Sequence, residues 1–591
     1  MKHKEFKSTV ERIWKQKMGN DPMSGIWLKL QKLKEKWRII EEKILRQKAR
    51  VNWIDHGNSN SKYFYAQLKI RANKNTITSV YNELGVKITD PKAVEKEFTC
   101  FFKQLMGKAT GLKPCPNTKF IKEGECPSMQ QQQDLIQDIT YAEINEAVKD
   151  MPNDKAPWSG WIPNRILHKT LAGSKMKQAW NCTTITLIPK VPAPTIVKDY
   201  MPIVCCTTVY KISAKILTKR IKKVIELIIG KAQSAFIERR SIVDNILFSH
   251  ELFNDYNRKD LSPRCVLKEA FNGVSPTSGL QANAKKSSIY ITGIAQHIKE
   301  QLMKLTGYAD GSLPFKYMGV PLSTRKLNIH QCLPLVEKIT KRVRCWSARL
   351  LSYSGRIQLI KYVLFGIQTY WVQIFLLPKK IMKMIETICR TFLWTGSIEC
   401  SKKALIAWDT LCQPKATGGL NVIYMKIWNK ATLLKHLWVL AMKKDTLWIK
   451  WAHNYYIKNR DIAEMDTPKA VAWVIRKIIE AREDVKQMRP GQNSLISTLE
   501  TLVKQGKFQI HRAYVQMQPQ FPKVMWKSIH LHINIHPRFK FHLWLAIHQR
   551  LATVDKLMKF GIQAPLECVF CATNMEVFEH LYFGCPKTHK L

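Results

Sequence analysis

Four residues near the C-terminus have the types and spacing of a metal site. In order they are Cys568, Cys571, His580 and Cys585. The pattern Cys-x2-Cys-x8-His-x4-Cys can supply two close pairs of soft ligands that surround one Zn²⁺ tetrahedrally. Three thiolates and one imidazole leave no open coordination position, so we predict a structural zinc site that contributes on the order of 10 kcal/mol to local folding. The alternative is three free thiols and an unrelated histidine.

Cations are the second group of residues with a chemical role. The chain has 95 Lys and Arg against 45 Asp and Glu, a formal net charge of +50, and such self-repulsion favours a polyanionic partner. Because the cations are spread along the chain, we predict non-specific RNA or DNA binding and no membrane partner; a solvated basic surface is the alternative. The candidate contacts are Lys211, Lys215, Lys219, Arg220, Arg239, Arg240, Arg538 and Lys540.

A long basic helix is predicted to carry the first of these cations. Apolar residues recur every three or four positions from Val209 to Ile229, with Lys and Arg on the other face. Taken alone, such a helix is more often ordinary surface than a nucleic-acid clamp. The second basic region lies around residues 537–542.

Other signals predict the elements of the N-terminal half. Apolar residues with heptad spacing between 26 and 44 predict an amphipathic helix, docked on its own chain or pairing with a partner. Two β-prone runs around Gly85 predict a hairpin. Asp90 before Pro91 predicts a helix start, and that helix should end near residue 107.

The next signals lie between a predicted linker and a predicted strand. Residues 113–133 read as the linker. Thr140 and Glu143 have capping-box spacing, which predicts a helix to about residue 150. Residues 181–189 alternate like a strand that enters a core.

The second half, from about residue 327 to 456, is rich in tryptophan. Aromatic rings interleaved with cations can stack on bases, but we expect most of these rings to pack a helical core. The tryptophans are Trp346, Trp371, Trp394, Trp408, Trp428, Trp438, Trp448 and Trp451.

Composition limits the class of protein and its compartment. A hydrophobic content of 45% over 591 residues is that of a globular, multidomain chain. Most of the 15 cysteines are scattered, which is typical of a reduced, intracellular protein. The chain begins without the apolar core of a signal peptide and has no run of eighteen apolar residues, so we expect neither secretion nor membrane spans.

Several stretches together resemble one family. Residues 526–585 look like the zinc-binding domain that follows the reverse transcriptase of plant LINE-type, non-long-terminal-repeat retrotransposons. The stretches LIPKVPAPTIVKDYMPIVCCTTVYKISAKIL and QSAFIERRSIVDNIL resemble its fingers region. LPFKYMGVPLS, WSARLLSYSGRIQLIKYVL and PKATGGLNV resemble the segments that lead from palm to thumb. The resemblance covers most of the chain in the family's order and implies an RNA-directed DNA polymerase ancestry.

The chain departs from this family where the chemistry should be. Polymerases hold two Mg²⁺ with carboxylates, which the family supplies after a Ser-Pro-Arg-Cys stretch and in an Asp-Asp hairpin. Here Ser262 to Cys265 lead to Lys268, and the sequence from about Phe271 resembles the part after that hairpin. No Asp-Asp pair occurs in the chain. Asp310, in Tyr-Ala-Asp-Gly, occupies the place of a family turn.

We therefore predict an α+β, helix-rich remnant of a right-hand polymerase without polymerase activity, with Mg²⁺ expected only if activity survives. An active RNA-directed DNA polymerase and a protein-interaction remnant without a selected function are the alternatives. The expected segments are a basic helical region (1–75), a hairpin, helix and linker (76–180), a fingers-like remnant (181–262), a truncated palm (263–325), thumb-like and connection-like helices (326–460), a linker (461–520) and the zinc-binding domain (521–591).

Overall fold

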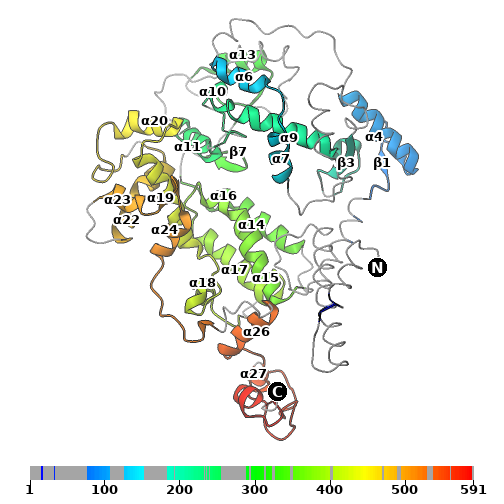
Figure 1. Ribbon diagram of the computed structural model, residues 1–591, viewed down its shortest axis with the longest axis vertical. Helices are drawn as coiled ribbons and strands as arrows, with labels where there is room; N and C mark the ends of the chain where they lie inside the picture. The colour runs from blue at the N-terminus through cyan, green and yellow to red at the C-terminus, as the bar shows by residue number, and fades with distance from the viewer. Residues whose placement is uncertain are drawn as a thin grey trace.

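The structure is a computed structural model dominated by helices (Figure 1). It describes residues 76–106, 125–151, 183–253 except 192, 232, 235 and 239, 288–345 except 292–293, 312–313 and 323–325, 351–399, 404–468, 471–488, 494–528, 537–559 and 561–588, with a few single positions before residue 76. Every sheet in these ranges has two strands. The predicted α+β, helix-rich class is confirmed at this level; its division into fingers, palm and thumb stays a prediction.

The first described unit is a small hairpin packed on one helix. Strand β1 (Val80–Tyr81) pairs antiparallel with β2 (Lys87–Ile88), and Gly85 turns between them with a φ of 77°. Asp90 caps α4 (Pro91–Met106) by accepting a 2.8 Å hydrogen bond from the Ala93 N–H. The predicted hairpin, helix start and helix end are confirmed.

A longer hairpin and a group of helices follow. Strand β3 (Thr183–Pro189) pairs in register with β4 (Tyr200–Cys206), and a 3₁₀ turn at Val197–Asp199 directly precedes β4. The predicted strand is confirmed, but most of its side chains are exposed, so it does not enter a core as predicted. Helix α6 (Met129–Ile136) begins inside the predicted linker because Ser128 forms a capping box with Gln131. Helix α7 (Tyr141–Lys149) has the predicted box of Thr140 and Glu143.

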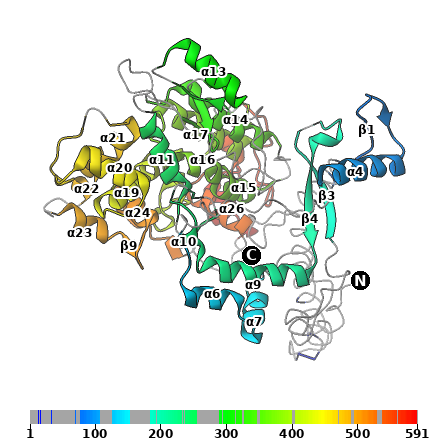
Figure 2. The same ribbon diagram turned by 90° about the horizontal axis from the view of Figure 1, so that it is seen from above.

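The predicted helix over 209–229 is divided in two. Helix α9 (Thr208–Lys222) ends before α10 (Ile225–Ile228). Two guanidinium N–H groups of Arg240 donate 2.9 Å bonds to the carbonyls of Glu226 and Ile229, which satisfies backbone acceptors at the end of α10. Figure 2 shows α6 and α7 beside α9.

Short strand pairs occupy the region predicted as a truncated palm. Strand β5 (Ser288–Ile289) pairs parallel with β6 (Ala309–Asp310), and β7 (Phe315–Tyr317) pairs antiparallel with β8 (Val320–Leu322). Helix α13 (Gln296–Thr306) connects β5 to β6. Residues 254–287, which include the junction after Cys265, lie outside the described residues, as do the loop 153–164 and, apart from Lys32, the heptad segment 26–44.

Most buried apolar residues belong to one cluster, which we call the helical core. It extends from α11 (Ile242–Leu252) to α26 (Pro537–Ile547). Between them lie α14 (Ile329–Arg344), α15 (Tyr353–Leu359), a π-helical turn (Ile360–Leu364), α16 (Phe365–Val372), α17 (Lys379–Thr395), α18 (Trp408–Cys412), a 3₁₀ turn (Lys415–Thr417), α19 (Met425–Ala441), α20 (Leu447–Ala452) and a second π-helical turn (His453–Ile457).

Tryptophans fill this core, as predicted for most of them. Trp371, Trp394, Trp408, Trp438 and Trp448 are buried. Trp428 packs on the cluster while partly exposed, and Trp346 lies outside the described residues. The described tryptophans are therefore mainly packing residues, because their rings are already enclosed by protein.

Residues 461–520, predicted as a linker, instead belong to the core. Ile475 and Ile478 are fully buried, and the Tyr514 hydroxyl accepts a 2.9 Å hydrogen bond from the Tyr424 N–H. Polar residues dilute the apolar signal here because the helices are short and bury one face only. The elements are α21 (Trp473–Glu480), α22 (Arg482–Met488), α23 (Leu495–Glu500), β9 (Val503–Lys504), β10 (Lys507–Phe508) and α24 (Ile510–Met517).

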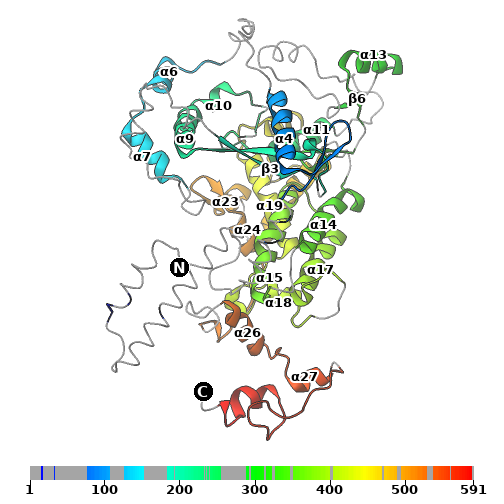
Figure 3. The same cartoon turned by 90° about the vertical axis from the view of Figure 1, so that its right-hand side faces the viewer.

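The C-terminus forms a separate small unit beyond α26, as Figure 3 shows. Helix α27 (Val554–Lys559) leads into residues 561–588, which we call the zinc unit, and the unit ends after a π-helical turn (His580–Gly584). No helix among the described residues is long and apolar enough to cross a membrane.

Candidate metal centre and nucleic-acid interface

A tight turn positions the first two cysteines of the zinc unit. Glu567 bridges antiparallel to Met575, and the Cys568 N–H donates a 2.7 Å hydrogen bond to the carbonyl of Asn574. Ala572 takes a left-handed φ of 56°, which lets the chain turn back directly after Cys571. The turn therefore points both sulfurs of the Cys-x2-Cys pair to one side.

The second ligand pair comes from the π-helical turn. His580 opens this turn and Cys585 follows its last residue. The turn is continuous with the preceding chain because the Leu581 N–H donates a 2.9 Å bond to the Val577 carbonyl. The spacing of four residues between His580 and Cys585 thus spans one wide helical turn. Both side chains face the tight turn that carries Cys568 and Cys571.

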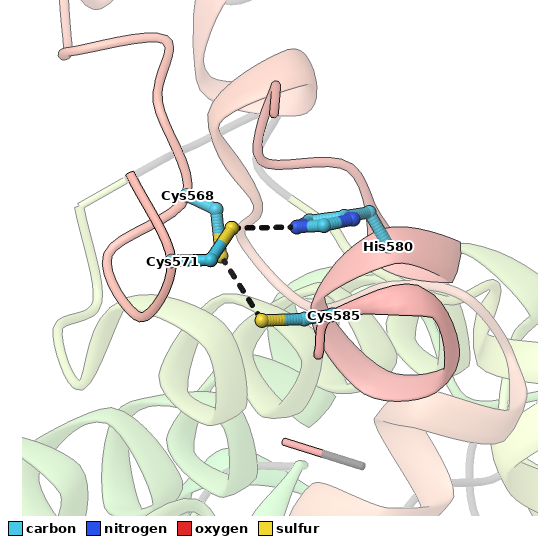
Figure 4. Close-up of side chains that lie close together, drawn as sticks. All are labelled: Cys568, Cys571, His580 and Cys585. Carbon is cyan, nitrogen blue, oxygen red and sulfur yellow. Dashed lines mark hydrogen bonds between the residues drawn. The ribbon is translucent and has the colours of Figure 1, made fainter. Parts of the chain in front are cut away.

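All four predicted ligands meet at one point, as Figure 4 shows. Their donor atoms lie within 4.8 Å of one another. Cys568 Sγ and Cys585 Sγ are 4.0 Å apart, and Cys571 Sγ lies 3.2 Å from His580 Nε2. A tetrahedral Zn²⁺ with bonds of about 2.3 Å to sulfur separates two sulfurs by roughly 3.8 Å, so the donors fit this ion. The sulfur separation is too long for a disulfide, whose bond is about 2.05 Å.

Local hydrogen bonds prepare one ligand for a cation. The hydroxyl of Thr573 donates a 3.2 Å bond to Cys571 Sγ. This bond, helped by neighbouring backbone N–H groups and by His580, lowers the pKa of the Cys571 thiol to about 5. A thiolate is the form that binds metal. Thr573 carries no recognisable sequence signal, because its role depends on the turn that folds it back onto Cys571.

The acidic residues between the ligands take no part in the cluster. Among the described residues, the only group of His, Cys, Asp and Glu side chains close enough to hold a metal consists of the two ligand pairs. Glu576 is buried, and its backbone N–H bonds to the Leu566 carbonyl. The arrangement therefore has the composition of a closed structural site, without the open position that hydrolytic sites keep.

The predicted nucleic-acid contacts on α9 are mostly engaged within the protein. Arg220 is buried, with Nε and Nη2 each 2.8 Å from a carboxylate oxygen of Glu143. Its Nη2 also donates to the Asp138 carbonyl at 3.0 Å. This arginine therefore joins α9 to α7, and its burial and internal partners argue against the predicted contact with phosphate.

The lysines of α9 differ in how many internal partners their amines have. Lys219 Nζ lies 2.7 Å from a carboxylate oxygen of Asp150 and 3.2 Å from one of Glu146. Lys215 Nζ donates a 2.7 Å bond to the Asp150 carbonyl. Lys211 is exposed. Carboxylates on α7 thus neutralise part of the cationic face that the sequence predicted to meet phosphate.

The remaining candidates are also placed unequally. Arg240 donates four hydrogen bonds to backbone carbonyls, so the structure gives it a role in holding the chain after α10. Arg239 lies outside the described residues, and so does the side chain of Arg538. Lys540, on α26, is half-buried, and burial together with Lys415 lowers the pKa of its amine.

The Arg220–Glu143 pair gives a prediction for pH dependence. The hydrogen bond from Arg220 is the main cause that lowers the pKa of Glu143 from 4.5 to about 2. Because the folded pKa is the lower one, its stabilising effect is complete above about 4.5 and is lost as pH falls toward 2. We expect Glu143→Gln to lower the urea midpoint at pH 6, by a difference that shrinks steadily between pH 4.5 and 2. A difference independent of pH would contradict this role of the carboxylate.

Comparisons with known proteins find a reverse transcriptase-associated family and two similar proteins. Residues 508–591 match a family described as zinc-binding in reverse transcriptase. A putative ribonuclease H protein of Arabidopsis thaliana is 33% identical over 129 residues, which are 22% of this chain and 21% of that protein. An uncharacterized 149 kDa protein of transposon TX1 from Xenopus laevis is 25% identical over 247 residues, 39% of this chain and 19% of that protein. The chain thus covers about a fifth of the length of either relative.

Proposed function

We propose that this chain is a retrotransposon-derived, reverse transcriptase-like protein that binds RNA or DNA without sequence preference, holds a structural Zn²⁺ and lacks polymerase activity. The single observation that carries this proposal is the converged Cys568, Cys571, His580 and Cys585 cluster inside a region that matches a reverse transcriptase zinc-binding family. The similarity to a transposon protein supports the same origin.

The proposed lack of activity rests on the carboxylates. The segment after Ser262–Cys265 leads to Lys268 instead of a metal-binding acid, and the sequence has no Asp-Asp pair. Asp310 lies on β6 with an oxygen 2.7 Å from Lys299 Nζ, so an internal cation already neutralises it. Two-metal catalysis needs carboxylates that hold both ions about 4 Å apart. A single ion-paired aspartate supplies no such arrangement.

A primer-extension assay tests the proposed lack of activity. We expect no template-dependent product from the full chain on an RNA or DNA template with either Mg²⁺ or Mn²⁺, because the carboxylates that would hold the two ions are missing. An active reverse transcriptase assayed in the same mixture is the positive control. Product of defined length that depends on the template would establish the alternative, an active RNA-directed DNA polymerase.

Nucleic-acid binding is tested by its dependence on salt. The net charge of +50 predicts that affinity for a single-stranded oligonucleotide falls steeply with salt concentration, with a log–log slope of about −0.7 for each phosphate contacted. Sequence changes in the oligonucleotide should have little effect. Affinity that stays flat between low and high salt would instead favour a protein-interaction remnant.

A further inference from the structure

Two long segments of this chain contain no acidic residue. Residues 410–444 and 501–554 both lack Asp and Glu entirely. The second segment has eight Lys and Arg, and the first has six Lys. A folded surface built from both segments would be cationic and could not neutralise itself through its own carboxylates.

Several contacts join the two segments at the end of the helical core nearest the zinc unit. The Val524 N–H donates a 3.1 Å bond to the Ala416 carbonyl. Trp544 Nε1 donates a 2.7 Å bond to the Gly418 carbonyl. Gly418 has a φ of 94°, and the Trp526 ring lies only 3.3 Å from where its Cβ would be. The 3₁₀ turn, the chain around residue 524 and α26 therefore meet closely.

These contacts define what we call the seam surface, which consists of Lys415, Lys523, Lys527, Lys540 and Phe539. Lys415, Lys523 and Lys527 are exposed. In the described part of the chain, none of the four amines has a carboxylate oxygen within 4.0 Å, in contrast to Lys219 on α9. Lys415 and the half-buried Lys540 are close enough for repulsion to contribute to the lowered pKa of Lys540. An anion that binds here would relieve this repulsion.

An aromatic ring accompanies the amines. Phe539 precedes Lys540 on α26 and is 64% exposed, whereas Phe541 and Trp544 of the same helix are buried. An exposed ring beside cations is the combination that binds single strands, because bases stack on the ring while amines hold phosphates. A duplex offers no unstacked base to the ring, so the combination favours single strands.

We propose that the seam surface is the main docking site for single-stranded nucleic acid, with the four lysines on consecutive phosphates and Phe539 stacked on a base. This inference rests on the proposed nucleic-acid binding and assigns it to this surface instead of α9. Charge complementarity favours a polyanionic partner, since a cluster of amines without carboxylates repels basic peptides.

The test replaces the four lysines in the full zinc-loaded chain. We expect Lys415→Gln, Lys523→Gln, Lys527→Gln and Lys540→Gln together to weaken binding of a labelled oligo(dT) of about 20 nucleotides by ten- to a hundredfold, and to reduce the salt slope by up to about 3. A matched variant removes the same charge elsewhere at exposed lysines of α13, β7 and α14, with Lys304→Gln, Lys316→Gln, Lys338→Gln and Lys341→Gln. That variant should lose less than about threefold in affinity for the oligonucleotide.

A separate variant tests the aromatic ring. Phe539→Ala should weaken single-strand binding by roughly five- to tenfold and leave binding of a duplex of equal length nearly unchanged. Equal losses on both substrates would overturn the stacking role. Zinc content and thermal midpoint, measured for every variant, verify that each one is folded.

The outcomes separate this inference from the proposed function. If the parent chain binds the oligonucleotide and both quadruple variants lose affinity equally, the seam assignment is wrong while nucleic-acid binding stands. If the parent chain does not bind it at all, both fail. Binding to anionic phosphatidylserine vesicles in preference to the oligonucleotide would also overturn the choice of partner.

Discussion

Removing the metal, or replacing Cys568 by Ser, should unfold the zinc unit and leave the helical core folded. Cys568 and Cys585 are almost fully buried, yet no described residue of the zinc unit belongs to the helical core. Many of its large side chains stay exposed, including Val569 and Phe583 at 75% and 70%. With so little apolar burial, we expect this segment to depend on the proposed Zn²⁺, which in small zinc modules supplies on the order of 10 kcal/mol.

Zinc stoichiometry and hydrogen exchange measure this effect. We expect one Zn²⁺ per chain by elemental analysis, and loss of exchange protection in residues 566–585 after chelation, with α14 unchanged. Cys345→Ser is the matched control, because this cysteine is exposed and caps α14, outside the zinc unit. A metal-free chain that keeps full protection around Cys568 would show that the unit folds without the ion.

Replacing Trp544 by Ala should release α26 from the helical core. Trp544 is fully buried, packs against Phe541, and bonds to the Gly418 carbonyl at 2.7 Å. Truncating a buried tryptophan costs about 3–5 kcal/mol, and the carbonyl would also lose a donor. This helix is what holds the chain before the zinc unit against the core, so its loss should affect that attachment more than the core itself.

Hydrogen exchange of α26 is the appropriate measurement. The expected loss corresponds to faster exchange in residues 537–547 by a hundred- to a thousandfold, since each 1.4 kcal/mol is a factor of ten. Trp544→Phe keeps most of the apolar volume and should cost only about 1–2 kcal/mol. If both variants accelerate exchange equally, the hydrogen bond and not the packing holds the helix.

Both expected effects arise within one segment of the chain. The family match begins at residue 508, inside the helical core, and runs through the zinc unit. The matched region is therefore not a detached domain in this structure: β10, α24 and α26 pack with the core, and the metal site lies beyond them. The seam surface lies along this attachment, which couples its geometry to Trp544.

The sequence by itself determined the features that depend on short spacing. The four proposed zinc ligands lie within eighteen positions. A tight turn followed by one helical turn brings such ligands together whatever surrounds them. The caps at Asp90 and Thr140 and the hairpin at Gly85 are equally local, because each is decided by a side chain that bonds a backbone group at most three residues away or by one residue with positive φ.

Only the tertiary structure decided which cations are free. Arg220 and Lys540 look alike in the sequence, but Arg220 meets Glu143 from 77 positions away, whereas Lys540 meets another lysine. The sequence did not show that residues 461–520 belong to the core. Their helices are short and half-buried, so their apolar faces become evident only against the helices that cover them. Charge and burial are properties of neighbours in space, and no local pattern specifies neighbours so far apart in the chain.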